Sequence, residues 1–250
     1  MTLLQVSGVT KRFGNLTAIG DVSLSIEPGE LRAIIGPNGA GKTTFFNLVS
    51  GLFPPTTGAI RFDGRDVTAL SPERRVARGL ARTFQITQVF PELSVADNIR
   101  IAVEIAAGYR LKPWLGRAAR ASVAERVSQL LAMGGLAERA GMRVGALSHG
   151  DQRAAEIMMS LALRPRLLML DEPTAGMGDQ ETYDIARLVR RLHRKEGLTI
   201  MLIEHDMRVV FNLAERIMVL AEGRVLAEGT PREIASSDRV QAAYLGKAAS

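Results

Sequence analysis

The most informative motif in the sequence is Gly36-Pro37-Asn38-Gly39-Ala40-Gly41-Lys42-Thr43, with Thr44 directly after it. Its glycines, lysine and threonine match the spacing G-x-x-x-x-G-K-[ST]. An apolar run, Leu31–Ile35, precedes it with the length of a buried strand, and the apolar residues after it recur at helical spacing. Glycines let a chain curl so that successive backbone N–H groups converge on phosphate oxygens. The sequence therefore predicts a phosphate-binding loop between a strand and a helix.

The same stretch indicates which groups would hold the phosphates. The helix that begins near Lys42 directs the positive end of its dipole at the loop, which favours an anion there. The Lys42 ammonium would reach the β- and γ-phosphates of a nucleotide, and the Thr43 hydroxyl would complete the ligand shell of a Mg²⁺ ion. We expect the residues from 36 to 44 to line the nucleotide site.

A second element that carries chemistry is an apolar run with two carboxylates at its end. Leu167–Leu170 has the length of an interior strand, and Asp171 and Glu172 follow it directly. Ligands of open parallel sheets bind at the carboxyl ends of the strands. Asp171 is then placed to hold Mg²⁺ directly or through water, and Glu172 to polarise a water that attacks the γ-phosphate. An acidic pair after a strand is a weak signal alone, and the phosphate loop makes it a strong one.

The order of strand and helix patterns predicts an α/β protein with a helical insertion. Strand patterns fill the first 35 residues, resume at Ile60 and Phe62, and alternate with helices again after Pro165. The expected elements are helices over 94–107, over 120–133 and from 148, a strand over 199–203, and a hairpin over 217–227. We expect one domain, 1–250, with a nucleotide-binding core from 1–90 and 164–250 and an all-helical subdomain at 91–163.

Composition restricts the class of protein. The chain has 250 residues, 46% of them hydrophobic, and no cysteine, which excludes disulfides, thiol catalysis and Cys-ligated zinc. The N-terminus lacks the layout of a signal peptide, and no apolar run approaches the about 18 residues of a membrane span, so we expect a soluble, cytoplasmic chain. The net charge of +6 is compatible with several interpretations: binding to nucleic acid, to an anionic membrane face or to phosphate-bearing ligands, or simply a solvated arginine-rich surface.

A further motif lies one helix before the acidic strand and reads Leu147-Ser148-His149-Gly150-Asp151-Gln152-Arg153. It resembles the signature motif of ATP-binding cassette (ABC) ATPases, usually Leu-Ser-Gly-Gly-Gln. Other motifs of that family follow in order over essentially the whole chain: Lys11-Arg12-Phe13-Gly14, Thr83-Phe84-Gln85, Pro173-Thr174-Ala175-Gly176-Met177 and Ile203-Glu204-His205-Asp206. The resemblance implies a P-loop NTPase (RecA-like) core with an N-terminal antiparallel β subdomain and an inserted all-helical subdomain.

The resemblance also implies roles for single residues, with ATP and Mg²⁺ as the cofactors. Phe13 would stack on the adenine, Gln85 would touch Mg²⁺ and sense a neighbouring membrane subunit, and His205 would contact the γ-phosphate. With Glu172 and Lys42, Gln85 and His205 make up the expected catalytic set. The expected metal ligands are Thr43, Gln85 and Asp171.

The signature motif implies a second subunit. In the family, Ser148 and Gly150 would meet the γ-phosphate held by the other subunit, so that two ATP molecules lie inside a head-to-tail dimer. An exposed helix N-terminus suits that role, although Ser148 followed by Asp151 is also a capping box and thus an ordinary helix start. The chain departs from the family pattern at His149, at Asp151 and at Gly178, where Asp is usual.

Three segments have weaker signals. His193 lies among arginines of a helix, where a solvated side chain is expected. Residues 85–91 would form the groove for a membrane subunit, with Phe90 as an exposed packing anchor. The basic stretch Tyr109–Arg120 would contact headgroups or channel loops, or would be a solvated loop.

A cassette without spanning segments resembles a stand-alone ATPase subunit of a bacterial importer. Glu204-His205-Asp206-Met207, Ala175-Gly176-Met177 and the tail 240–246 are similar to the LivG-type ATPases of branched-chain amino acid importers, while related urea and amide importers share Leu147-Ser148-His149-Gly150. This implies a homodimer or a heterodimer with a paralogous subunit, transmembrane permease subunits, and a peripheral place on the cytoplasmic face of the membrane. A solute-binding protein would be an indirect partner, and no nucleic acid is expected. A non-transport cassette acting on ribosomes or DNA is the alternative.

Overall fold

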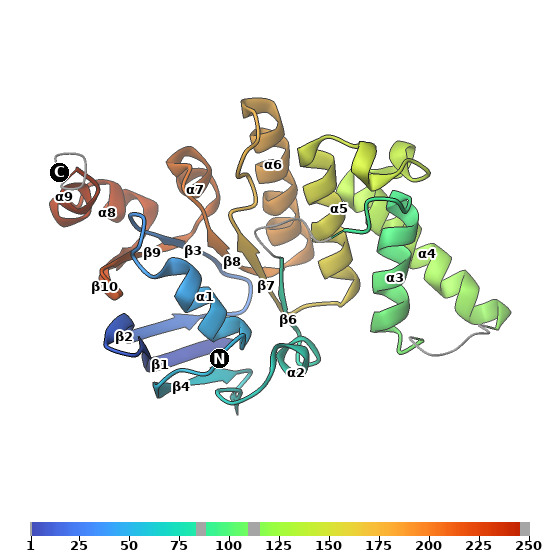
Figure 1. Cartoon of the computed structure of the whole chain (residues 1–250). Helices are drawn as coiled ribbons and strands as arrows, with labels where there is room; N and C mark the ends of the chain where they lie inside the picture. Colours follow the sequence, from blue (N-terminus) through green and yellow to red (C-terminus); the bar gives the residue numbers. More distant parts are fainter. Residues whose placement is uncertain (1, 84–88, 110–115, 246–250) are drawn as a thin grey trace.

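The computed structural model describes residues 2–83, 89–109 and 116–245 of the chain. Two sheets and a helical region are arranged side by side, with helix α1 (Lys42–Ser50) between the sheets (Figure 1). The C-terminal helices lie at the end of the molecule opposite to the helical region. The phosphate loop joins the larger sheet to α1.

The larger sheet has six strands and carries the expected chemistry. In spatial order these are β10 (Arg224–Gly229), β9 (Arg216–Ala221), β3 (Leu31–Ile35), β8 (Thr199–Ile203), β7 (Leu167–Asp171) and β6 (Leu80–Arg82). All neighbours pair in parallel except β9 and β10, which form the predicted antiparallel hairpin. Because parallel strands leave the sheet on the same side, the ends of β3, β7 and β8 lie at one edge.

The smaller sheet is antiparallel and lies at the N-terminal end of the chain. Its strands, in spatial order, are β2 (Leu16–Ile26), β1 (Leu4–Phe13), β4 (Thr57–Phe62) and β5 (Arg65–Asp66). Alternate residues of β2, such as Val22 and Leu24, point into a core that also receives Phe45 and Phe46 of α1. The expected N-terminal antiparallel unit is therefore present, and it packs on the phosphate-loop helix.

The described residues between 91 and 163 fold mainly as helices. They form α3 (Val95–Ala106), α4 (Arg117–Gly134), α5 (His149–Ala162) and two short 3-10 turns, Ala137–Arg139 and Val144–Ala146. The hydroxyls of Ser94 and Ser148 cap α3 and α5, so both predicted starts are confirmed. Helix α4 begins three residues before the expected 120, since Gly116 is its N-cap.

The remaining helices cover the larger sheet or its edge. They are α2 (Pro72–Val76), α6 (Asp179–Glu196), α7 (Met207–Leu213), α8 (Pro231–Ala235) and α9 (Asp238–Leu245). Within the described ranges, no helix combines the length and the apolar character that a membrane crossing requires.

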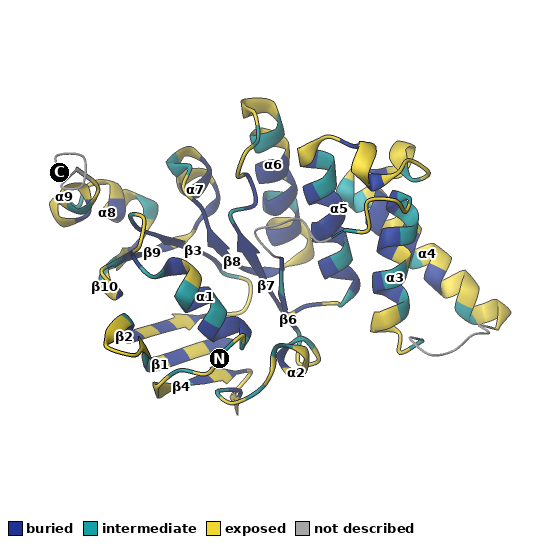
Figure 2. Ribbon diagram, in the orientation of Figure 1, coloured by how far each residue is buried: buried dark blue, intermediate teal, exposed yellow. Residues whose placement is uncertain are grey.

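The central strands are buried on both faces, as Figure 2 shows by their dark colour. In β3, β7 and β8 successive residues face two different cores. Leu168, Leu170 and Leu202 point to the core that holds α5 and α6, whereas Met169 and Met201 point to the core that holds α1. This two-sided burial explains why these strands appear in the sequence as mainly apolar runs, with Arg32 of β3 and Asp171 of β7 as buried exceptions.

Candidate nucleotide site

The loop from 36 to 41 curls because its glycines adopt backbone conformations that other residues avoid. Gly36, Gly39 and Gly41 have φ of 151°, 77° and 96°. A Cβ on Gly36 would lie 2.1 Å from the carbonyl oxygen of Leu220, and one on Gly41 would lie 2.8 Å from that of Ala18. Neighbouring backbone thus fills the space that a side chain would need.

Lys42 and the start of α1 give the loop its positive character. The Lys42 ammonium lies 6% exposed and donates to the carbonyl oxygens of Gly36, at 2.7 Å, and Pro37, at 3.1 Å. The N-cap of α1 is Gly41, so no capping side chain covers the first N–H groups of the helix. Uncapped N–H groups and an ammonium at one place favour an anion there.

A pocket of about 560 Å³ opens in front of the loop. Its walls come from four parts of the chain: Leu16, Thr17 and Ala18, the loop residues from 38 to 44, Glu172 with His205, and Glu222 with Gly223. The structure thus brings together most of the predicted site residues. Gly36 and Pro37 lie behind this wall, where they accept hydrogen bonds from Lys42.

Glu172 and His205 meet across the ends of two parallel strands. The His205 Nε2 atom lies 2.8 Å from the Glu172 Oε1 atom, although the two residues are 33 positions apart. The Glu172 side chain is 17% exposed and that of His205 is 44% exposed. Glu172 also has a φ of 46°, a strained conformation for a residue with a side chain, and such strain concentrates at functional sites.

The two predicted metal ligands that the structure describes differ in their exposure to the pocket. Thr43 lines the pocket and is exposed, whereas Asp171 is 1% exposed and is not among the described residues that line it. The Asp171 Oδ2 atom lies 2.7 Å from an N–H group of Arg82, a buried ion pair that the sequence did not indicate. Gln85, the third predicted ligand, lies outside the described residues.

The structure does not bring Phe13 to the pocket wall. Its ring is 48% exposed and meets the ring of Phe53 edge to face at 5.5 Å, with the Lys11 ammonium 5.2 Å from the Phe13 ring centre. Among the described residues, Leu16 is the large apolar side chain at the wall, and it is 67% exposed. No residue pattern in the sequence pointed to Leu16.

Of the predicted membrane-subunit groove, only Val89, Phe90 and Pro91 are described. Phe90 is 51% exposed, as an anchor would be. Its backbone is held by Asn98, which is buried and bonds both the N–H and the carbonyl oxygen of Phe90. In the basic segment, residues 110–115 lie outside the described residues.

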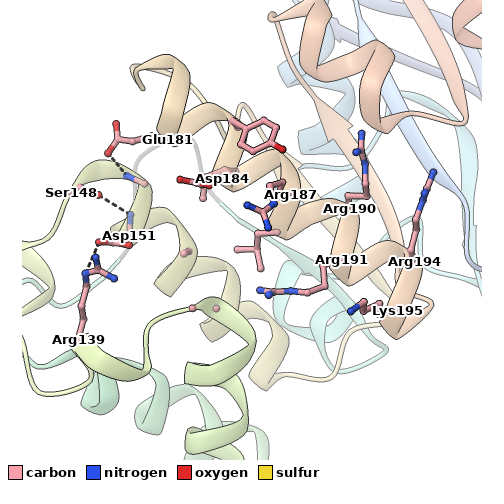
Figure 3. Close-up of a pocket in the computed structure, with 17 residues that line it drawn as sticks. Arg139, Ser148, Asp151, Glu181, Asp184, Arg187, Arg190, Arg191, Arg194 and Lys195 are labelled. Atoms are coloured by element: carbon pink, nitrogen blue, oxygen red, sulfur yellow. Dashed lines mark hydrogen bonds and ion pairs between the residues drawn. The ribbon is translucent and has the colours of Figure 1, made fainter.

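The signature motif forms the N-terminus of α5, shown in Figure 3. The Ser148 Oγ atom accepts a hydrogen bond from the Asp151 N–H at 3.2 Å, as the capping prediction requires. The Asp151 carboxylate does not return to the helix, because it lies 3.2 Å from Arg139. The Gly150 N–H donates instead to Glu181 of α6 at 3.1 Å. This bond, together with one from Ser148, lowers the pKa of Glu181 below its ordinary value.

This motif borders a second pocket, of about 700 Å³, between α5 and α6. Its acidic residues gather near Ser148, and its cations continue along α6 toward the C-terminal end: Arg187, Arg190, Arg191, Arg194 and Lys195. Because α6 also carries four carboxylates (Asp179, Glu181, Asp184 and Glu196), its five cations leave it a net charge of only +1.

The expectation for His193 was wrong. The residue is 9% exposed, its Nδ1 atom lies 3.2 Å from the carbonyl oxygen of Leu198, and its Nε2 atom lies 3.2 Å from Glu215. The helical spacing explains this position, because His193 follows Val189 by four residues and thus shares the apolar face of α6.

Comparisons with known proteins agree with this geometry. Residues 19–175 match the family model described as ABC transporter, and residues 224–250 match one described as branched-chain amino acid ATP-binding cassette transporter. The chain is 39% identical to the high-affinity branched-chain amino acid transport ATP-binding protein BraF of Pseudomonas aeruginosa and 40% identical to the corresponding protein LivG of Escherichia coli, over 98% of each chain. It also resembles the ADP conformation of MJ1267, an ATP-binding cassette of an ABC transporter, with a TM-score of 0.85 and 28% identity, over 98% of this chain and 99% of that one.

The first family match spans more than half of the chain and includes the phosphate loop and the acidic strand. The two curated relatives match it from end to end. The predicted α/β fold and the predicted family are therefore confirmed. The chain belongs to the ABC transporter family and is an ATP-binding, ATP-hydrolysing cassette of that family.

Proposed function

We propose that this cassette drives the uptake of branched-chain amino acids or closely related small solutes by a bacterial importer. The observation that carries this proposal is the match of residues 224–250 to the branched-chain amino acid cassette model, because the phosphate loop and the acidic strand are common to cassettes of many cargoes. The names of BraF and LivG support the same cargo class.

The proposed catalytic roles follow from charge and position. Glu172 polarises the attacking water, and His205 contacts the γ-phosphate beside it. The two side chains are placed to act together because they meet at 2.8 Å on the pocket wall. Lys42 leaves the carbonyls of its own loop to neutralise the β- and γ-phosphates. Gln85 completes the catalytic set, as the family resemblance implies.

Mg²⁺ fits the donors of this site. Within the described ranges, no group of three or more His, Cys, Asp or Glu side chains could hold a metal by itself. A Mg²⁺ ion held mainly by phosphate oxygens and water needs few protein ligands, and the exposed Thr43 hydroxyl is a suitable one. The buried Asp171 would act through water, and Gln85 would be a further ligand, as the family resemblance implies. The ion would neutralise charge on the phosphates.

The remaining proposals concern assembly. A second cassette, identical or paralogous, would place its Ser148 and Gly150 against the γ-phosphate bound here, and permease subunits would contact the region around Phe90. The chain would then lie at the cytoplasmic face of the membrane, with a solute-binding protein as an indirect partner. Phe13 would stack on adenine after leaving its contact with Phe53.

Two measurements test the function. Replacing Glu172 by Gln removes the base, so the variant is expected to bind ATP and to accumulate as an ATP-bound dimer in size-exclusion chromatography. Normal turnover by that variant would contradict the role of Glu172.

The cargo is tested in membranes of the source organism. The tagged chain should co-purify with permease subunits, and its deletion should abolish uptake of labelled leucine while uptake of labelled urea continues. Loss of urea uptake alone would favour a urea or amide importer. Recovery of ribosomes or DNA in place of permeases would favour a non-transport cassette.

A further inference from the structure

Glu204 is a buried carboxylate beside the candidate catalytic pair, and the proposed mechanism assigns it no role. It lies directly after β8 and is only 3% exposed. Both carboxylate oxygens are engaged. The Oε1 atom accepts hydrogen bonds from the N–H, at 3.0 Å, and from the hydroxyl of Thr174. The Oε2 atom accepts from the N–H groups of His205, at 2.8 Å, and Asp206, at 3.5 Å.

These bonds join the two loops that carry Glu172 and His205. Thr174 belongs to the loop after β7, and His205 to the loop after β8. One more bond connects the same loops, from the Glu172 N–H to the carbonyl oxygen of Ile203 at 3.0 Å. The loop after β7 is thus hydrogen-bonded to the end of β8 and its loop at two points, the backbone of Glu172 and Thr174 two residues later. Glu172 has a φ of 46° at the first of these points.

We propose that Glu204 is a positioning residue that sets the distance and orientation between Glu172 and His205. This inference rests on the proposed catalytic roles of that pair. The carboxylate touches neither nucleotide nor water in the mechanism, and it acts through the two loops. A shift of about 1 Å between catalytic groups can lower a rate about 100-fold, so a tether of this kind has a large effect on turnover.

The hydrogen-bond pattern explains why the position requires a carboxylate. All groups that point at Glu204 are donors, from three backbone N–H groups and one hydroxyl. A carboxylate is a pure acceptor at both oxygens, whereas the amide of Gln would direct its own N–H groups at one of the two loops. Asp would have the acceptors but would lack the length to reach Thr174 and His205 together.

The test compares kcat and ATP affinity in the full-length chain. We expect Glu204→Gln to lower kcat roughly 10- to 100-fold while the Kd for ATP stays within about two-fold, because the phosphate loop is unchanged. Thr174→Val, which removes only the hydroxyl bond, should lower kcat by a smaller factor, and Thr174→Ser, which keeps the hydroxyl, should restore it. Unchanged kcat in Glu204→Gln, or an equal loss of kcat and ATP affinity together with a lower melting temperature, would overturn the proposal.

A matched control is available in the same sheet. Glu215 also contacts a histidine, His193, and accepts a backbone N–H, that of Leu31, but it lies away from the pocket. Glu215→Gln should leave kcat unchanged, and a fall equal to that of Glu204→Gln would overturn the proposal. Assays of Glu172→Gln and His205→Ala distinguish failure of the proposed catalytic roles from failure of the positioning role. Normal turnover in either of these two variants refutes the catalytic role of the replaced residue. Normal turnover in Glu204→Gln alone refutes only the positioning role.

Discussion

Arg75 supports the helix that carries the phosphate loop, and its removal should destabilise the whole domain. The side chain is 1% exposed. One terminal nitrogen donates to the carbonyl oxygens of Leu48, at 2.7 Å, and Val49, at 2.6 Å, at the C-terminal end of α1. The other nitrogens donate to Leu70, at 3.1 Å, and Thr68, at 3.0 Å. A cation at the C-terminal end of a helix is also stabilised by the negative end of the helix dipole.

The size of the effect follows from these four acceptors. Replacing Arg75 by Met keeps most of the volume and removes four hydrogen bonds, two to the buried carbonyls of Leu48 and Val49 and two to the partly buried carbonyls of Leu70 and Thr68. Each lost bond costs about 1 to 3 kcal/mol, and the Leu48 carbonyl oxygen keeps a bond from the Gly51 N–H. We use the lower end of this range, because the folded protein also bears the cost of burying the charged guanidinium, and the variant avoids that cost. The same burial lowers the pKa of Arg75 to about 10. The free energy of unfolding should therefore fall by about 4 kcal/mol, equivalent to a drop in Tm of roughly 8 to 16 °C.

The assay is urea unfolding of the nucleotide-free chain, followed by circular dichroism. Arg74→Met is the matched control, since Arg74 is the exposed neighbour in the same helix and should change stability by less than about 0.5 kcal/mol. The m-values of both variants should equal that of the parent, so that midpoints report stability directly. A difference between the two variants below about 1 kcal/mol would refute the assigned role of Arg75.

Three other changes have defined outcomes. Glu181→Ala removes the acceptor that now occupies the Gly150 N–H, so ATP-driven dimers should form at lower protein concentration, whereas Asp184→Ala on the same helix should have no effect; weaker dimers in Glu181→Ala would contradict this account. Burial raises the pKa of Tyr244 to about 12, so its tyrosinate absorbance should appear about two pH units above that of a free tyrosine, and Tyr244→Phe should remove that late step. This tyrosine stabilises the fold fully below about pH 10, and its contribution is lost as the pH rises toward 12. Phe13→Ala should raise the KM for ATP severalfold with little change in kcat, and an unchanged KM would show that the ring stays with Phe53.

Five cations of α6 gather along one pocket. Arg187, Arg190, Arg191, Arg194 and Lys195 line one pocket with the signature motif at its other end (Figure 3). Four carboxylates of the same helix balance most of this charge, so α6 separates opposite charges along its length. Lys42 places one further positive charge at the phosphate loop.

Local patterns predicted the elements that are buried on both faces or capped by a hydroxyl. The strands Leu31–Ile35 and Thr199–Ile203 were expected within their observed bounds, because two-sided burial favours a mainly apolar run. Arg32 is the exception in the first strand, and its buried guanidinium pairs with Glu30 and Glu228. The starts of α3 and α5 could be predicted from Ser94 and Ser148, because each capping hydroxyl accepts a hydrogen bond from an N–H group only three residues later in the chain. His193 shows the limit of local patterns. Its arginine neighbours suggested a solvated side chain, although its helical spacing places it on the apolar face of α6.

The phosphate loop, the acidic strand end and the family could be predicted from the amino-acid sequence, because each depends on short runs of neighbouring residues. The pairing of distant residues became visible only in the fold: Glu172 with His205, Glu204 with Thr174, and Asp171 with Arg82. The physical reason is the parallel sheet, which brings the ends of β7 and β8 to one edge although a whole helix separates them in sequence. Side-chain partners across that edge leave no periodic pattern in the chain, and so they appear only once it has folded.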